Sequence, residues 1–325
     1  RHWRLEPGRM LLIDTEQGRI ISDSEIKNSL ATSRPYQEWV DKVRIRLTDI
    51  KTEPQAVGLN LTTKALMGVF GYTREDVERL IKPKAINGQE PVLSMGNDAP
   101  LAVLSNQPKS LYDYFRQLFA QVTNPAIDPI REEMVTSLVS FIGPRPDLLN
   151  IMDNNPPIRL EVQQPILDAV EMEKIRNISK YTDNKFRSKQ LDITYPLSWG
   201  KDGIEARLAS IRAAAIDAVK TGHNILIISD RNVAADRLAI PALLATSAVH
   251  LCLVENGLRT STGLVVETGS ARTVHQFALL GGYGAEAIHP YVALQVVAEL
   301  APDAQSVKTY QDNYIHAIDK GLYKT

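Results

Sequence analysis

Carboxylate side chains follow three apolar segments in the second half of the chain. Asp230 ends the run NILIISD, Glu255 lies near the end of HLCLVEN, and Glu267 follows GLVV. The ends of parallel strands meet at one edge of a sheet, where two carboxylates could act as general acid and base. Acidic residues also form turns and caps at such positions, and Glu267 could pair with Arg231 or Arg272. The pattern alone therefore favours a structural role and predicts no catalytic residue.

The turn ETGSAR (267–272) is a second candidate site. An apolar run ends at Gly269 and Ser270, and we expect a helix to begin at once, so that free backbone N–H groups face the strand ends. This geometry suits a phosphate group. Neither Walker-type nor GxGxxG spacing accompanies the turn. Gly269 and Ser270 are therefore candidates for a phosphate-binding loop on weak evidence.

The metal-binding residue types are few and scattered. Cys252 is the only cysteine, which excludes an internal disulfide and an all-cysteine iron–sulfur or zinc site within this chain. Its apolar neighbours predict a packed thiol on a buried strand. The single cysteine is typical of a protein in a reducing compartment. No two of the six histidines have metal-ligand spacing, so we expect no metal site.

Composition and charge describe an ordinary globular chain of 325 residues. Hydrophobic residues make up 44% and charged residues 23% of the sequence. The formal net charge is −1, with 37 basic and 38 acidic residues, so we expect neither a nucleic-acid nor a membrane partner. No apolar run approaches the roughly 18 residues of a membrane-spanning helix.

The elements that must position the strand-end residues lie in the second half. A long helix is predicted at 202–221, with Asp202 as its cap and Gly222 as its stop. Alternation of short apolar strands with helices predicts a parallel sheet covered by helices. The predicted strands are 191–195, 224–230, 250–256, 263–268 and AIHPY.

The first half has mostly helical patterns after an initial hairpin. The runs MLLID (10–14) and GRIIS (18–22) predict the hairpin, and two helices broken at Pro35 follow it. Capping boxes begin two more helices, one at Thr73 and one at Ser110. We expect Pro83 to close the first of these, and the second to run to Val122.

Two prolines interrupt the helical pattern in QVTNPAIDPIREE (121–133). Asp128 followed by Pro129 is a good start for a helix, which we expect to end at Gly143. From these residues alone, 123–128 is a rigid turn between helices. The segment 143–157, dense in proline and asparagine, is the best candidate for a boundary.

Several long motifs resemble the central domain of glutamate synthase, the large flavoprotein that makes glutamate from glutamine and 2-oxoglutarate. The resemblance covers essentially the whole chain, apart from the variable stretch 143–190. It is carried by NGQEPVLSMGNDAPLAVLS, DYFRQLFAQVTNPAIDPIRE, ISDRNVAADRLAIPALLATSAVH, GLRTSTGLVVETGSAR and LGGYGAEAIHPYVA. The first residues resemble the segment that leaves the family's glutaminase domain, and the last resemble the segment that enters its flavin domain.

The resemblance implies an α/β fold: a degenerate or partial (β/α) TIM-barrel-like parallel sheet with an additional helical N-terminal portion. We expect an N-terminal linker and hairpin at 1–50, a helical portion at 51–150 and a β/α portion at 151–325. In such a degenerate barrel, Gly269 and Ser270 would be a vestigial phosphate loop.

Because the sequence opens on Arg1 and not on the family's nucleophilic cysteine, we expect a fragment of a longer protein. The fragment is expected to be inactive by itself, with no catalytic residue and no cofactor. The longer enzyme would carry FMN and an iron–sulfur cluster in the cytoplasm, or in the plastid stroma of a plant. Its electron donor, ferredoxin or a pyridine nucleotide, is left open.

In the family, the central domain connects the glutaminase and FMN domains and helps line an ammonia tunnel between them. Ammonia is small and neutral, so backbone carbonyls, hydroxyls and amides suit the walls better than charged side chains. Two uncharged polar segments meet this requirement, and glycine in the second permits close backbone approach. The tunnel candidates are Thr123, Asn124 and Pro125, with Ser94, Gly96 and Asn97.

Two functions of other classes remain open. One is a self-standing (β/α) barrel enzyme that binds flavin or phosphate at ETGSAR. The other is a regulatory module that binds a small molecule.

Overall fold

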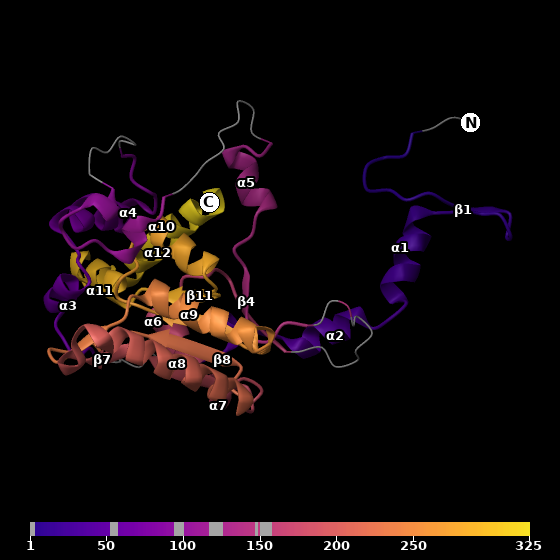
Figure 1. Ribbon diagram of the computed structural model, residues 1–325. Helices are drawn as coiled ribbons and strands as arrows, with labels where there is room; N and C mark the ends of the chain where they lie inside the picture. Colours follow the sequence, from indigo (N-terminus) through magenta and orange to yellow (C-terminus); the bar gives the residue numbers. More distant parts are fainter. Residues whose placement is uncertain (1–3, 53–57, 94–100, 117–125, 147–148, 150–157) are drawn as a thin grey trace. The chain divides into compact units, whose positions relative to one another are not determined.

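The computed structural model describes residues 4–52, 58–93, 101–116, 126–146, 149 and 158–325. The chain divides into two compact units, Arg1–Ile45 and Arg46–Thr325 (Figure 1). The strand β3 (Arg44–Arg46) spans the boundary between them.

The first unit begins with the predicted hairpin. Its strands β1 (Leu12–Asp14) and β2 (Arg19–Ile21) are antiparallel, with Leu12 opposite Ile21. The Asp14 carboxylate closes the turn by accepting hydrogen bonds from two backbone N–H groups. The helices α1 (Asp23–Thr32) and α2 (Tyr36–Val43) follow, and neither buries a side chain. The break at Pro35 is confirmed.

The second unit is built on a parallel sheet of four strands in the order β11-β10-β8-β6. These strands are β6 (Ser188–Asp192), β8 (Ile225–Ser229), β10 (Gly263–Glu267) and β11 (Ala287–His289). Every residue of β8, β10 and β11 is buried, as their continuous apolar sequences require. The α/β class and the parallel sheet are thus confirmed.

The strand order of this sheet follows the chain order without reversal, as in a (β/α) barrel and unlike a doubly wound sheet. A parallel bridge joins Ile166 to Ile288, so the segment before the first sheet strand reaches the β11 edge. Both features are compatible with a partial barrel, which stays a prediction.

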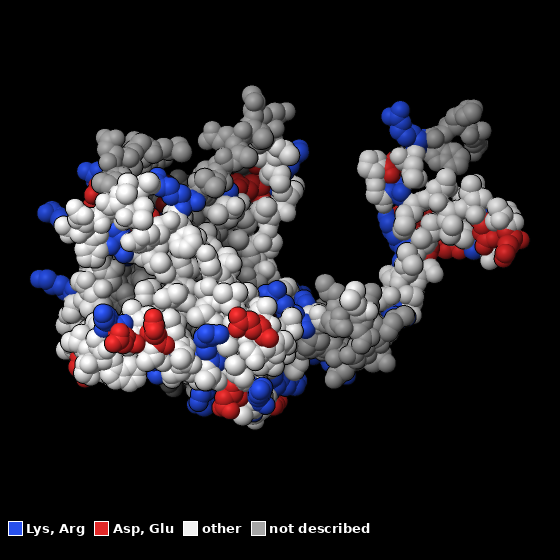
Figure 2. Space-filling model, viewed as in Figure 1, with Lys and Arg blue, Asp and Glu red and all other residues white. Residues whose placement is uncertain are grey.

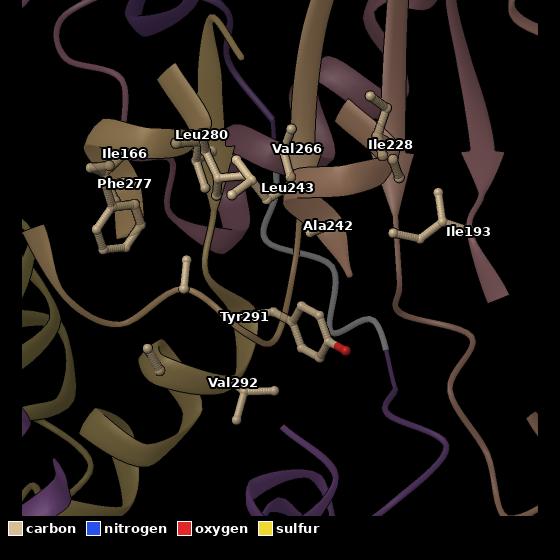
Figure 3. Close-up of a cluster of buried hydrophobic side chains, with 14 of the residues drawn as sticks. Ile166, Ile193, Ile228, Ala242, Leu243, Val266, Phe277, Leu280, Tyr291 and Val292 are labelled. Atoms are coloured by element: carbon tan, nitrogen blue, oxygen red, sulfur yellow. The ribbon is translucent and has the colours of Figure 1, made fainter. Parts of the chain in front are cut away.

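Helices connect the strands and surround the sheet. The helices α8 and α9 contact each other, while α12 packs against α4 and α11 (Figure 1). Aliphatic and aromatic residues from the strands and from these helices form one core, with Tyr291 and Val292 in the lower part of Figure 3. The helices are α6 (Ala169–Arg176), α7 (Ile178–Tyr181), α8 (Gly203–Lys220), α9 (Ala242–Glu255), α10 (Val274–Gly282), α11 (Tyr291–Leu300) and α12 (Val307–Lys324).

The stretch before the sheet consists of short elements: η1 (Leu47–Asp49), α3 (Thr63–Val69), the π-helix η2 (Asp76–Ile81), α4 (Lys82–Asn87), η3 (Ala102–Leu104), η4 (Leu111–Tyr114) and α5 (Pro129–Val135). Small strands and turns complete the unit: β4 (Ser140–Ile142), β5 (Arg159–Val162), β7 (Thr194–Pro196), η5 (Leu197–Asp202), β9 (Arg237–Ala239) and η6 (Arg259–Ser261).

The predicted strand at 250–256 is wrong, because this segment is the C-terminal half of α9. Half of the residues of α9 are buried, and its apolar residues do not keep to one face. A buried helix without a polar face has the same apolar sequence as a buried strand. The expected burial of Cys252 is nevertheless confirmed. The predicted strand 191–195 is also divided, between β6 and β7.

Pro83 does not close the helix that begins at Thr73. The helix continues through Pro83 to Asn87, where Gly88 ends it in the left-handed region. A π-helical stretch precedes the proline, and the Lys82 N–H donates to Val77 five residues earlier. This wider turn accommodates a residue that lacks an N–H and would crowd a regular α-helix. The capping box between Thr73 and Asp76 is confirmed.

The helices predicted around residue 120 are shorter in the described residues. Ser110 and Asp113 form the expected capping box, but the helical turn ends at Tyr114 because Phe115 is extended. Asp128 caps α5 as predicted, accepting two backbone N–H bonds. The helix ends at Val135 and not at Gly143, because residues 140–142 pair with β5 in an antiparallel ladder.

Candidate functional site

Buried polar side chains gather at the carboxyl ends of β8, β10 and β11. Ser229 and Asp230 come from the end of β8, Glu267 and Thr268 from the end of β10, and His289 from the end of β11. All five side chains are buried. The parallel register explains the cluster, since Glu267 lies opposite both Ser229 and His289.

Glu267 is the centre of an ion-pair network. Its Oε1 accepts from Arg176 Nη2 at 2.8 Å and from Arg231 Nη1 at 3.1 Å, and its Oε2 accepts from Ser229 Oγ at 2.6 Å. Burial acts to raise the pKa of this carboxyl. His289 when it is protonated, the charges of Arg176 and Arg231, and the hydrogen bond from Ser229 outweigh burial, so the pKa is lowered and Glu267 is an anion.

His289 is held in one tautomer. Its Nδ1 lies 2.9 Å from the carbonyl oxygen of Leu167, which can only accept, so Nδ1 carries the proton. Burial lowers the pKa of this imidazole, against the opposing effect of Glu267. The ring is therefore neutral at neutral pH, with Nε2 as a hydrogen-bond acceptor.

Asp230, one residue after β8, has only uncharged partners. Its carboxylate accepts from the Gly269 N–H at 3.0 Å and from the hydroxyl of Thr268. The side of the loop is covered by Tyr72, whose hydroxyl donates to the Gly269 carbonyl at 2.9 Å. Burial raises the pKa of Asp230 to about 7, although the hydrogen bonds from Thr268 and Gly269 oppose the shift.

Two backbone N–H groups of the ETGSAR loop, those of Gly269 and Ser270, are already engaged within the chain. Asp230 takes the Gly269 N–H, and the Ser270 N–H donates to Thr268 Oγ1 at 3.1 Å. The space beside the loop is filled, because a Cβ added to Gly269 would lie 2.3 Å from the Phe70 ring. The expectation that a helix begins directly after Ser270 is wrong, since α10 starts at Val274. The arrangement does not fit a bound phosphate, and the vestigial character of the loop stays a prediction.

A cavity of about 240 Å³ opens beside the Glu267 network, and we name it the carboxyl-edge cavity. Its walls come from the strand ends and from α6, α11 and α12. They are both charged and apolar: Leu59, Ala169, Met172, Glu173, Arg176, Arg231, Glu267, His289, Tyr291, Leu294, Gln295 and Gln311. The carboxyl edge is where ligands bind in parallel α/β folds.

Comparison with known families decides the relationship of the chain. The model of the glutamate synthase central domain matches residues 65–325. The chain belongs to the glutamate synthase central domain family. The model of class-II glutamine amidotransferases matches residues 1–39.

Relatives of the chain are large glutamate synthases. It is 41% identical to "Glutamate synthase [NADH]" of Schizosaccharomyces pombe and 39% identical to "Glutamate synthase [NADPH] large chain" of Bacillus subtilis, with 99% of the chain covered in each case. It is 37% identical to the chloroplastic ferredoxin-dependent glutamate synthase of Oryza sativa. It spans only 16–21% of the length of these relatives.

The structure brings together two of the three carboxylates considered from the sequence of this central domain. Asp230 and Glu267 are neighbours at one edge, but Glu255 lies at the exposed end of α9, where it pairs with Arg212 at 3.2 Å. Glu267 pairs with Arg231 as expected, whereas Arg272 pairs with Asp76 at 3.1 Å.

Sequence reasoning missed Arg176 and His289 as members of this cluster. Arg176 reaches Glu267 across 91 positions of sequence, and no local spacing signals such a contact. His289 could have been found, because it lies within the predicted AIHPY strand, directly after two apolar residues.

The tunnel candidates Thr123, Asn124, Pro125, Ser94, Gly96 and Asn97 lie outside the described residues. Within the part of the chain that the structure describes, no group of three or more metal-ligating side chains could hold a metal ion. In the same residues, no helix is long and apolar enough to cross a membrane. Basic and acidic side chains are interspersed on the face shown in Figure 2.

Proposed function

We propose that this chain connects the glutaminase and FMN-binding parts of a glutamate synthase and contributes walls to the path of ammonia between them. The observation that carries the proposal is the succession of two matches along one chain. The amidotransferase model matches residues 1–39 and the central-domain model matches 65–325. This succession supports a chain that joins a glutamine-hydrolysing domain to the domain that follows it.

The chemistry of the sheet edge supports a role without catalysis. The buried carboxylate Glu267 is engaged by two guanidinium groups and a hydroxyl, while Asp230 is engaged by Thr268 and Gly269. Groups held in this way stabilise the fold and are poorly placed to exchange protons with a substrate. FMN and the iron–sulfur cluster would belong to other parts of the longer enzyme.

The ammonia path is proposed along Thr123-Asn124-Pro125, with residues 94–97 as a second wall. From the sequence, we expect Pro125 to bias Asn124 toward extended backbone and so to leave carbonyl groups free of helical bonding. Three residues further on, the Asp128 cap fixes the start of α5. Uncharged hydrogen-bonding groups can relay ammonia without protonating it.

Blocking substitutions in a full-length glutamate synthase that carries this domain test the proposal. Thr123→Leu and Asn124→Leu place bulky apolar groups on the proposed wall. We expect the glutamine hydrolysed per glutamate synthesised to rise several-fold, while glutaminase activity itself persists. Thr48→Leu, at an exposed threonine of η1, is the matched control and should keep the wild-type ratio. Unchanged coupling in both wall variants would remove these residues from the path.

The alternative of a self-standing flavin barrel enzyme has a simple test. Because the N–H groups of Gly269 and Ser270 are engaged within the chain and Phe70 fills the space beside Gly269, we expect the purified chain to show no stoichiometric flavin absorbance after incubation with FMN. A stoichiometric flavin spectrum would overturn the connecting-domain proposal in favour of the flavin enzyme.

A further inference from the structure

The carboxyl-edge cavity combines charges of both signs in a space of small-molecule size. Two guanidinium groups, Arg176 and Arg231, and two carboxylates, Glu173 and Glu267, lie on its walls. The lowered pKa of His289 keeps the imidazole uncharged. The formal charges of the walls therefore cancel. The side chains of Arg176, Arg231 and Glu173 keep part of their surface exposed, whereas Glu267 is fully buried.

The charged walls are held rigidly before any ligand arrives. Arg176 Nε donates to Glu173 Oε2 at 3.2 Å, and its Nη2 donates to Glu267 at 2.8 Å. Asn177 Nδ2 donates to Glu173 Oε1 at 2.6 Å. The Arg231 guanidinium stands over the Tyr291 ring, 5.3 Å from its centroid. A preorganised site of this kind loses little conformational freedom on binding.

The remaining walls are suited to an uncharged side chain. Met172 and Leu294 supply apolar surface, and the amide of Gln295 supplies a donor and an acceptor. The volume of about 240 Å³ lies below the roughly 300–1,000 Å³ of sites for drug-sized ligands. Such a cavity suits a ligand smaller than a drug-sized molecule.

We propose that the carboxyl-edge cavity binds a small zwitterion of the α-amino-acid class. The ligand carboxylate would lie against the guanidinium groups of Arg231 and Arg176, and the ligand ammonium against Glu173. A simple anion would gain the guanidinium contacts but would lie beside the carboxylate of Glu173 with no positive group of its own to offset it. A simple cation would have the converse difficulty. Only a ligand that carries both charges satisfies both signs of the wall.

Titration calorimetry of the purified chain with matched probes tests this proposal. L-Valine carries both charges, isovalerate has the same skeleton without the amine, and isobutylamine has it without the carboxylate. L-Glutamine tests a longer polar side chain. We expect L-valine, L-glutamine or both to bind at one site per chain, and isovalerate and isobutylamine to bind at least tenfold more weakly than the better amino acid.

Two variants with matched controls locate the site. Glu173→Gln and Arg231→Gln should each weaken binding of the amino acid at least tenfold. Glu255→Gln and Arg145→Gln remove exposed charges elsewhere and should leave binding unchanged. Because Arg231→Gln also disturbs a buried ion pair, its thermal unfolding and circular dichroism are compared with those of the wild type. Glu173→Gln keeps the test decisive if the arginine variant is unfolded.

Three results would overturn the proposal: no binding of either amino acid, equal binding of isovalerate, or full binding by a folded Glu173→Gln variant. Equal isovalerate binding would show a site for anions instead. The proposal does not depend on the ammonia path, because titration of this chain and coupling in the full-length enzyme can fail independently.

Discussion

Two buried carboxyl groups at the same sheet edge have opposite electrostatics. Glu267, at the end of β10, pairs with two guanidinium groups, and its pKa is lowered. Asp230, just after β8, has hydroxyl and backbone partners, and its pKa is raised to about 7. Both groups are almost inaccessible to water. The difference shows that burial alone does not set the charge of a carboxyl; the charges of its partners decide it.

We expect the largest effect on stability when the charge of Glu267 is removed. Glu267→Gln removes the buried carboxylate that Arg176 and Arg231 share, while Arg176 keeps its contact with Glu173. We expect the free energy of unfolding to fall by about 3–5 kcal/mol in urea denaturation, because an uncompensated buried charge is costly. The exposed pair of Glu255 and Arg212 is the control, and Glu255→Gln should cost about 0–1 kcal/mol. Equal losses in the two variants would contradict the buried-network interpretation.

The raised pKa of Asp230 makes the stability of the fold depend on pH. Its folded-state pKa of about 7 exceeds the ordinary 3.8, so the folded chain holds this proton more tightly than the unfolded chain. Its stabilising contribution is complete below the ordinary pKa and is lost as the pH rises through about 7. Asp230→Asn cannot ionise. We expect its stability relative to the wild type to rise by on the order of 2 kcal/mol between pH 5 and pH 8.

Urea denaturation of both proteins across this pH range measures the difference. Asp319 also has a raised pKa of about 7, but it is present in both proteins and cancels in the comparison. Parallel stability curves for wild type and Asp230→Asn would show that Asp230 is not a proton-binding group of the fold.

A smaller effect sharpens the description of the loop beside Asp230. Gly269→Ala places a methyl group 2.3 Å from the Phe70 ring, so we expect a loss of about 1–3 kcal/mol from overpacking. Adding Phe70→Leu should recover part of this loss if the clash is its cause. Gly281→Ala in α10 meets nothing within 4 Å and should stabilise the protein by up to about 1 kcal/mol. Thermal unfolding of the three variants provides the measurement.

Local signals in the sequence predicted the elements that depend on local interactions. The strands β8 and β10 were predicted because each is a short apolar run that ends in a polar residue. The Asp128 cap and the Thr73 capping box were predicted because their partners lie within three residues. Such features need no knowledge of the rest of the fold.

Elements that depend on distant partners were mispredicted or missed. The helix α9 was mistaken for a strand because its apolar residues do not keep to one face, and some of them, such as Leu251 and Val254, are exposed. The helix from Pro129 was predicted too long, because β5, a distant segment, recruits residues 140–142 into a ladder. For the same reason, Asp230 and Glu267 were considered from the sequence, whereas Arg176 and His289 were missed. The position of Glu267 at the end of an apolar run can be seen in the sequence. Its contact with Arg176 from α6 is revealed only by the folded structure.

The hydrogen bond between the Gly269 N–H and the Asp230 carboxylate has one further consequence. The Gly269 N–H is occupied by a ligand tethered to the same chain, and a rigid tether gives it an effective concentration of at least about millimolar. Any phosphate-bearing molecule that approached this loop would have to displace a competitor that never diffuses away. The hydrogen bond from Gly269 to Asp230 therefore leaves this N–H unavailable to an anion from solution.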